Sequence, residues 1–257
     1  MFASLSSNHR LAPLVLALVS ACSDATTGGS THPLTVSITT RAQGSLAYRS
    51  SADVVITVGA SSLVISKAQL VARRIELAPA GATACAGTAE GGDDNGGTST
   101  DGCAEVETGP TLIDIPLDAS TKTTLSASVP AGTYRALEMR IGPVSSGNRS
   151  ATAFLAAHPE FQNVSVRVEG TYNGKAFVFT SPVDASIESA FATAVTVDAA
   201  SPNVTIAIDI ANWFSDGSNG TLDPGDGANA ARISANIAQS FHAFEDDNHD
   251  GHDDHQR

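Results

Sequence analysis

The sequence is poor in cysteine, in aromatic residues and in positive charge. It contains three cysteines, nine phenylalanines, three tyrosines and one tryptophan. Only 14 lysines and arginines stand against 27 aspartates and glutamates, so the formal net charge is −13. Binding to nucleic acid depends on lysine and arginine neutralising phosphates, so no nucleic-acid partner is expected. The same balance argues against adhesion to anionic lipid through a basic surface.

The sequence also lacks the common catalytic signatures. It has no glycine-rich phosphate loop, no His-Glu-x-x-His, no Gly-x-Ser-x-Gly and no Cys-x-x-Cys. We therefore predict that the protein is not an enzyme. The alternative is a hydrolase of envelope polymers that uses scattered carboxylates. Such an enzyme needs two suitably spaced carboxylates in an aromatic-lined cleft, and the sequence has few aromatic residues to line one.

Near the amino terminus, an apolar run at residues 11–21 is shorter than the about 20 residues that a membrane-spanning helix needs. The run follows a short polar segment with Arg10 and ends in small residues, which is the pattern of a secretory signal. Residues 18–22 read Leu-Val-Ser-Ala-Cys and resemble a bacterial lipobox. An ordinary signal peptide that is cleaved nearby is the alternative.

The lipobox resemblance implies that residues 1–21 are removed and that Cys22 carries a diacylglycerol and an N-acyl chain. An anchor of three chains holds essentially permanently. Ser23 follows the cysteine, which in bacterial lipoproteins implies sorting to the outer membrane. We therefore expect a lipid-anchored protein of the cell envelope that faces the periplasm or the cell surface. Residues 22–33 are small and polar and predict a flexible tether.

Export also bears on the two remaining cysteines, Cys85 and Cys103. In an oxidising compartment an even pair of this kind predicts a disulfide. This disulfide would close the base of a low-complexity acidic loop at residues 79–102, and closure of such a loop stabilises a fold by roughly 3 kcal/mol. A metal site is the alternative, but two cysteines without partners at ligand spacing are a poor zinc site.

Val, Ile, Thr and small residues dominate the rest of the chain, which favours strands. Apolar and polar residues alternate with period two at residues 34–39 and 54–58. Residues 66–77 alternate with one break near Arg73 and Arg74, which a β-bulge would explain; a helix is the alternative. Further strands are predicted at residues 63–65, 112–115, 123–129, 134–141, 164–170, 194–197 and 204–210. Asn173-Gly174 predicts a type I′ hairpin turn.

These patterns predict one all-β domain at residues 34–244, an antiparallel β-sandwich with a C-terminal amphipathic helix and an acidic tail. Residues 151–158 predict a short helix that Pro159 ends, and a sub-boundary near residues 145–160 is left open. Residues 230–244 carry Ile233, Ile237, Phe241 and Phe244 at helical spacing. Trp213 is interpreted as core, with a sugar platform as the alternative.

Two segments resemble a known group of proteins. Residues 63–77 read LVISKAQLVARRIEL, and residues 112–142 contain LIDIPLD and TLSASVPAGTYRALEMRIG. Together they resemble a family of bacterial secreted lipoprotein domains of unknown function, over roughly residues 34–143. The resemblance implies a transthyretin-like or immunoglobulin-like sandwich in the envelope, and it implies no activity. The chain departs from the Thr-Asp-Ala-Pro opening of that family, reading Thr-Thr-Arg-Ala at residues 39–42.

The acidic tail, residues 245–257, has the most chemical content. Its residues 246–254 read DDNHDGHDD and match the first nine positions of a calcium loop. The predicted ligands, at positions 1, 3, 5, 7 and 9, are Asp246, Asn248, Asp250, the backbone carbonyl of His252, and Asp254. Gly251 falls at the turn position. Arg257 stands at position 12, where such loops use a bidentate glutamate, so we expect weak binding unless Asp216, Asp223 or Asp226 assists.

Two alternatives for the tail are left open. His249, His252 and His255 are three residues apart and would hold a transition metal if the tail became helical. A solvated, disordered acidic tail is the simpler interpretation. Taken together, the sequence predicts a lipid-anchored, non-enzymatic binding or structural β-sandwich with weak calcium binding at its tail. Its partner would be a protein or a polysaccharide.

Overall fold

The computed structural model describes residues 30–40, 47–48, 53–58, 61–81, 103–107, 109–218 and 220–255. Cys22 and Cys85 lie outside these ranges, as does the signal segment. Within the described residues no helix combines the length and the apolar character needed to cross a membrane.

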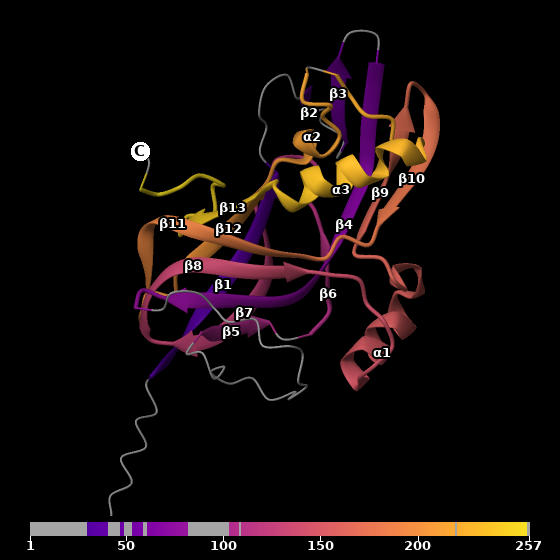
Figure 1. The fold of residues 1–257 in the computed structure, drawn as a ribbon. Coiled ribbons are helices and arrows are strands. Elements are labelled where there is room, and N and C mark those ends of the chain that lie inside the picture. Colours follow the sequence, from indigo (N-terminus) through magenta and orange to yellow (C-terminus); the bar gives the residue numbers. More distant parts are fainter. Residues whose placement is uncertain are drawn as a thin grey trace, which may run out of the picture.

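The described chain forms an all-β sandwich of two sheets (Figure 1), which confirms the predicted fold class. The smaller sheet has the order β13-β12-β1-β7. Its strands are β1 (Thr31–Thr40), β7 (Lys122–Pro130), β12 (Asn203–Ile208) and β13 (Phe241–Glu245). The larger sheet contains β2 (Ala47–Tyr48), β3 (Val54–Val58), β4 (Ser61–Pro79), β5 (Ala104–Glu107), β6 (Thr111–Asp114), β8 (Gly132–Ile141), β9 (Val166–Tyr172), β10 (Lys175–Ser181) and β11 (Ala185–Val197).

Strand β4 organises the larger sheet, because β3, β5, β6, β8 and β9 all pair with it. Its 19 residues alternate between the core and the outer face. The predicted bulge is confirmed, since the register with β8 shifts between Ala72 and Arg74. A second shift, between Ile65 and Lys67 in the pairing with β9, was not predicted. The bulges allow one long strand to serve different partners along its length.

The chain changes sheets at the Pro-Ala-Gly-Thr-Tyr segment. β7 ends at Pro130 in the smaller sheet, and β8 begins at Gly132 in the larger one. The buried Tyr134 hydroxyl donates a hydrogen bond to the Pro130 carbonyl at 2.7 Å. Burial raises the pKa of this tyrosine. The hydrogen bond fixes the corner, which gives a physical reason for the tyrosine in this motif.

Helices cover the sandwich at two places (Figure 1). Helix α1 (Arg149–Ala157) is capped by the Asn148 side chain, and the 3₁₀ helix η1 (Pro159–Phe161) follows it. Together they pack Phe154 and Phe161 on Val71 of β4. The other helical segments are α2 (Ile210–Trp213), η2 (Gly227–Asn229) and α3 (Ala230–Ala238). Helix α1 confirms the short helix that was predicted before Pro159.

Two predicted boundaries are wrong. The helix expected over residues 230–244 ends at Ala238, and residues 241–245 form strand β13 against β12. Ile233 and Ile237 pack as helical residues, whereas Phe241 and Phe244 belong to the strand. The tether was placed at residues 22–33, but Thr31 already pairs with Pro130 in β1. In both cases pairing with a distant strand outweighed the local pattern.

Candidate cation-binding loop

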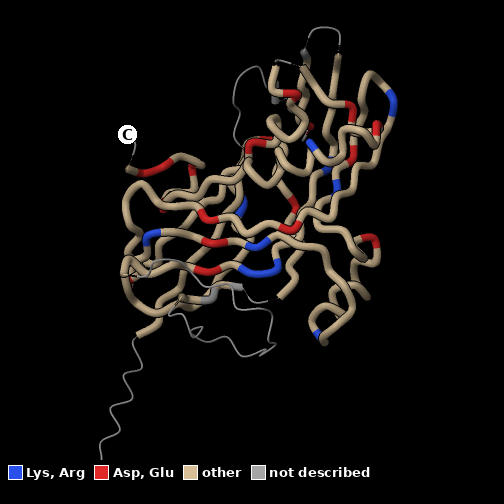
Figure 2. The backbone as a smooth tube through the Cα atoms, viewed as in Figure 1, with Lys and Arg blue, Asp and Glu red and all other residues tan. Residues whose placement is uncertain are grey.

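The predicted calcium loop follows β13, the edge strand of the smaller sheet. The backbone from Asp246 to Asp254 turns back on itself, because the Asp254 amide donates to the Glu245 carbonyl at 3.1 Å. Figure 2 shows this acidic segment beside the carboxyl-terminal end of the described chain. Residues 245–255 lie within the described chain, with Asp246 and Asp253 buried, so the interpretation as a disordered tail is wrong for this stretch.

Asp246 is the centre of the loop, and its side chain is 0% exposed. Its Oδ1 accepts the Asp250 amide at 2.9 Å, and its Oδ2 accepts the Gly251 amide at 3.0 Å. The Thr205 hydroxyl of β12 also donates to Oδ2, at 2.8 Å. Three donors satisfy the buried carboxylate, which would otherwise be costly to bury.

Short turns in which a side-chain oxygen accepts the backbone amide two residues later repeat along the loop. Asn248 Oδ1 accepts the Asp250 amide, and Asp250 Oδ1 accepts the His252 amide, both at 2.9 Å. Gly251 has φ +79°, in the left-handed region that glycine adopts without strain. The residues predicted at positions 1, 3 and 5 therefore curl around one tight turn, with the glycine at its bend.

Asp254, predicted at position 9, closes the loop from the other side. Its Oδ2 accepts the Asp247 amide, and its Oδ1 accepts the Asn248 side-chain amide, both at 2.8 Å. The structure thus brings Asp246, Asn248, Asp250 and Asp254 into one turn. His252 contributes its backbone to that turn, and its side chain is exposed.

The loop covers polar side chains on the outer face of the smaller sheet. Ser37 and Thr39 point away from the core, yet both are buried. Ser37 Oγ lies 3.4 Å from His249 Nδ1. A Cβ on Gly251 would lie 2.9 Å from Thr121 Oγ1 and 3.5 Å from Thr39 Oγ1, so the bend of the loop rests on these threonines.

Asn203 of β12 ties the loop to the sheet. Its Nδ2 donates to the Asp246 carbonyl at 2.8 Å, and its Oδ1 accepts the Ser37 hydroxyl at 2.8 Å. Its backbone amide donates to Asp247 Oδ1 at 3.0 Å. Asn203, Thr205 and Ser37 were not predicted as residues of this site. The available signal was the polar residues at outward positions of β1 and β12, whose inward residues are apolar.

The electrostatics of the loop are strongly acidic. Burial raises the pKa of the Glu245 carboxyl, and the nearby Asp247 carboxylate raises it further. His255 lies 3.4 Å from Glu245 and opposes that effect. Hard carboxylate, amide and carbonyl oxygens are the ligand set that calcium prefers. A carboxylate oxygen has two lone pairs, and Asp246 Oδ1 accepts one amide, whereas Asp246 Oδ2 already accepts two donors, the Gly251 amide and the Thr205 hydroxyl.

The structure does not bring together the transition-metal site considered for the three histidines. The segment forms turns rather than a helix, so His249 faces Ser37 while His255 faces Glu245. Among the described residues, no group of three or more His, Cys, Asp or Glu side chains stands close enough together to hold a metal ion. The same finding covers the three carboxylates of the predicted calcium set, Asp246, Asp250 and Asp254. That set also includes the Asn248 amide oxygen and the His252 carbonyl oxygen.

The acidic residues considered as helpers belong to a different loop. Asp216 accepts the amides of Ser218 and Gly220, which lower the pKa of its carboxyl. Asp223 accepts the Gly225 amide, and Asp226 caps η2. Each side chain thus serves its own turn.

Other predicted residues are placed as follows. Cys103 is buried against Ala78 and Ala136, and Cys85 lies outside the described residues, so the disulfide stays a prediction. Lipidation of Cys22 also concerns residues that are not described. Trp213 is 0% exposed and its indole N–H donates to Ser240, which excludes the sugar platform and confirms a core role.

Comparison with known proteins gives little further information. No known protein family matches the chain, and no curated protein matches it. One solved structure is similar in its path, "MbnP from Methylosinus trichosporium", with a TM-score of 0.42 and 14% identity. The match covers 84% of this chain and 99% of that chain. At this level the likeness carries no argument about function.

Proposed function

We propose that the protein is a lipid-anchored β-sandwich of the bacterial envelope that acts as a non-enzymatic binding or structural module and carries a calcium loop at residues 246–254. The alternative is a hydrolase of envelope polymers that uses scattered carboxylates. The observation that carries the proposal is the conformation of the loop, in which Asp246, Asn248 and Asp250 accept backbone amides around Gly251.

Calcium in this loop would fasten the end of the described chain to the sandwich. Asp246 is bonded to β12 through Thr205, and the loop rests on the outer face of β1. An ion that joined the loop carboxylates would relieve their mutual repulsion and would stabilise the docked loop. Without a bidentate glutamate at position 12, we expect affinity on the order of 10⁻⁴ to 10⁻³ M, the range of extracellular modules.

Calorimetric titration of the whole chain with calcium chloride tests the loop. We expect one binding event, and we expect Asp250→Asn to weaken it about tenfold because the ligand charge falls while the amide oxygen still accepts the His252 amide. Asp223→Asn is the matched control, since Asp223 makes the same kind of turn with Gly225 in another loop. Absence of calcium heat, or equal weakening by both substitutions, would contradict the calcium assignment.

Metabolic labelling tests the anchor. In bacterial cells given an alkyne-tagged palmitate, we expect the wild-type chain to be labelled and the Cys22→Ser chain to be unlabelled. The reason is that the diacylglycerol is attached through a thioether, which needs the cysteine sulfur. Western blotting of the same fractions controls for expression. Equal labelling of both chains would contradict lipidation at Cys22.

A further inference from the structure

Strand β10 forms one edge of the larger sheet, beyond β9 (Figure 1). On one side it pairs with β9 along its whole length, from Lys175 to Ser181. Among the described residues, no strand pairs with its other side. An edge of this length offers a row of backbone donors and acceptors to which another chain can add a strand.

The backbone groups of three residues point to the open side of β10. The Ser181 carbonyl accepts the amide of Ser165, the residue that precedes β9. Along a strand, the backbone groups of successive residues point to opposite sides. Ala176, Val178 and Thr180 therefore present their N–H and C=O groups away from β9. The side chains of these three residues are exposed on the outer face of the sheet.

The open edge lacks the features by which natural edge strands avoid pairing. Such strands carry a proline, a charged side chain near their middle, or a bulge. Residues 176–181 read Ala-Phe-Val-Phe-Thr-Ser, without proline or charge, and the register with β9 has no shift. Val178, at the centre, is 57% exposed, and it is the one large hydrophobic side chain that is exposed in the described part of the chain.

The order of side chains along β10 matches a second copy of the same strand. Residues 176–180 read nearly the same in both directions about Val178. In an antiparallel pair centred there, Val178 meets Val178 of the other copy, Phe177 meets Phe179, and Ala176 meets Thr180. This register pairs all three outward residues, and each pair exchanges two hydrogen bonds. A register shifted by two residues leaves one of the three unpaired in each copy.

The charges near the edge are compatible with this pairing. Glu169 lies opposite Val178 on β9, and Lys67 Nζ lies 4.0 Å from its carboxylate. Two Glu169 side chains in the paired copies would be three strand spacings apart, roughly 14 Å, which exceeds the screening length of about 8 Å. At each end, Lys175 of one copy meets the uncharged Ser181 of the other. No two like charges therefore stand opposite each other on the paired strands.

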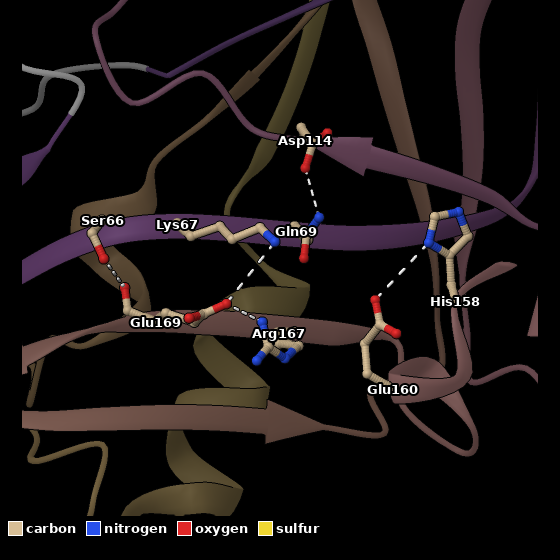
Figure 3. A network of polar contacts seen from close by, with 8 residues as sticks. All are labelled: Ser66, Lys67, Gln69, Asp114, His158, Glu160, Arg167 and Glu169. Carbon is tan, nitrogen blue, oxygen red and sulfur yellow. Dashed lines mark hydrogen bonds and ion pairs between the residues drawn. The ribbon is translucent and has the colours of Figure 1, made fainter.

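The outer face behind β10 is polar, and its side chains have partners within one copy. Arg167, which lies opposite Thr180, belongs to a row of polar side chains that continues through Gln69 on β4 to Asp114 on β6. Gln69 Nε2 donates to Asp114 Oδ1 at 2.7 Å, and Arg167 donates to Glu169 (Figure 3). Pairing at the edge does not have to break these contacts.

We propose that the protein self-associates through β10, as a two-fold dimer in which the larger sheets of two copies join edge to edge at Val178. A two-fold interface needs a surface that is complementary to itself, which the order of residues 176–180 supplies. Strand β10 offers seven residues, whereas a stable interface of standard size uses about 20–30 residues on each side. The dimer is therefore weak, with a Kd on the order of 10⁻⁴ M.

Cysteine cross-linking tests the register. The whole chain is oxidised mildly at about 0.1 mM, in a detergent whose micelles outnumber the protein. We expect Val178→Cys to form a disulfide-linked dimer, because residues of a hydrogen-bonded pair have Cα atoms about 5.5 Å apart. Thr180→Cys alone is the matched control, since its two copies are four residues out of register, roughly 14 Å apart. A mixture of Thr180→Cys with Ala176→Cys is expected to cross-link, and the wild-type chain gives the background from its own cysteines.

Sedimentation of the whole chain measures the association without a cross-link. Val178→Lys places two like charges on the two-fold axis, so it is expected to weaken dimerisation at least about tenfold. Ala153→Lys, at an exposed position of α1, is expected to associate as the wild type does. Cross-linking of Thr180→Cys alone as fast as Val178→Cys, a Val178→Cys chain that stays monomeric, or a Val178→Lys chain that associates like the wild type would each overturn the inference. Calcium titration and lipid labelling are independent of these outcomes.

Discussion

Replacement of Asp246 by alanine is expected to release the loop from the sandwich and to lower the free energy of unfolding by about 3 kcal/mol. The substitution removes one buried carboxylate and leaves two donors without an acceptor, the Thr205 hydroxyl and the Gly251 amide. The Asp250 amide loses one of its two acceptors and keeps Asn248 Oδ1. Denaturant unfolding gives the loss. Hydrogen exchange is expected to become fast at the Asp250 and Gly251 amides, and calcium binding is expected to disappear with the docked loop.

Asp198→Ala is the control for this prediction. Asp198 is exposed and accepts the Ala200 amide in its own turn, so it makes a comparable local bond without burial. We expect its loss to stay within about 1 kcal/mol. If Asp246→Ala unfolds like the wild type and its amides stay protected, then the carboxylate does not hold the loop.

The difference between these aspartates explains what the sequence predicted about the site and what it did not. The spacing of Asp246, Asn248, Asp250 and Gly251 predicts a turn that presents oxygens, because each contact involved is local. Burial of Asp246 depends on Thr205, which lies in strand β12, far from the loop in sequence. A pattern within nine residues carries no information on that partner, so the docked loop was not predicted.

The fold shows the same division between local and distant causes. The Asn173-Gly174 turn was predicted because type I′ geometry needs positive φ at both residues, and both have it. The parallel pairing of β1 with β12 was not predicted, because it joins segments such as Val36 and Val204 that are far apart in sequence. Strand β11 was predicted only at its last residues, since small and polar residues fill its outward positions.

The row of polar side chains on the outer face of the larger sheet was inaccessible from sequence for the same reason. Gln69, Asp114 and Arg167 come from three strands, and only the register of β4 with β6 and β9 aligns them. A shift of one residue would turn each strand's side chains to the opposite face. The bulge between Ile65 and Lys67 sets that register on the β9 side, so the row depends on a backbone irregularity that the side-chain pattern did not reveal.

Gly170→Ala is expected to disrupt this bulge and to destabilise the protein by about 3 kcal/mol or more. A Cβ at Gly170 would lie 1.9 Å from the Val64 carbonyl oxygen and 3.1 Å from Ile65 Cα. These are backbone atoms of the strand to which most of the larger sheet is paired, so no side-chain rotation relieves the contact. Either β9 or β4 must move, and the packing of Leu63, Ile65 and Val168 in the core must change with it.

Gly132→Ala is the control for the glycine prediction. The nearest atom to a Cβ at Gly132 is Tyr134 Cε2 at 3.9 Å, which is ordinary contact, and its φ is not positive. Alanine there is expected to change stability by less than about 1 kcal/mol, because it also restricts the unfolded chain. Denaturant unfolding of both variants gives the comparison. Equal stability of the two variants would show that β4 and β9 do not approach this closely.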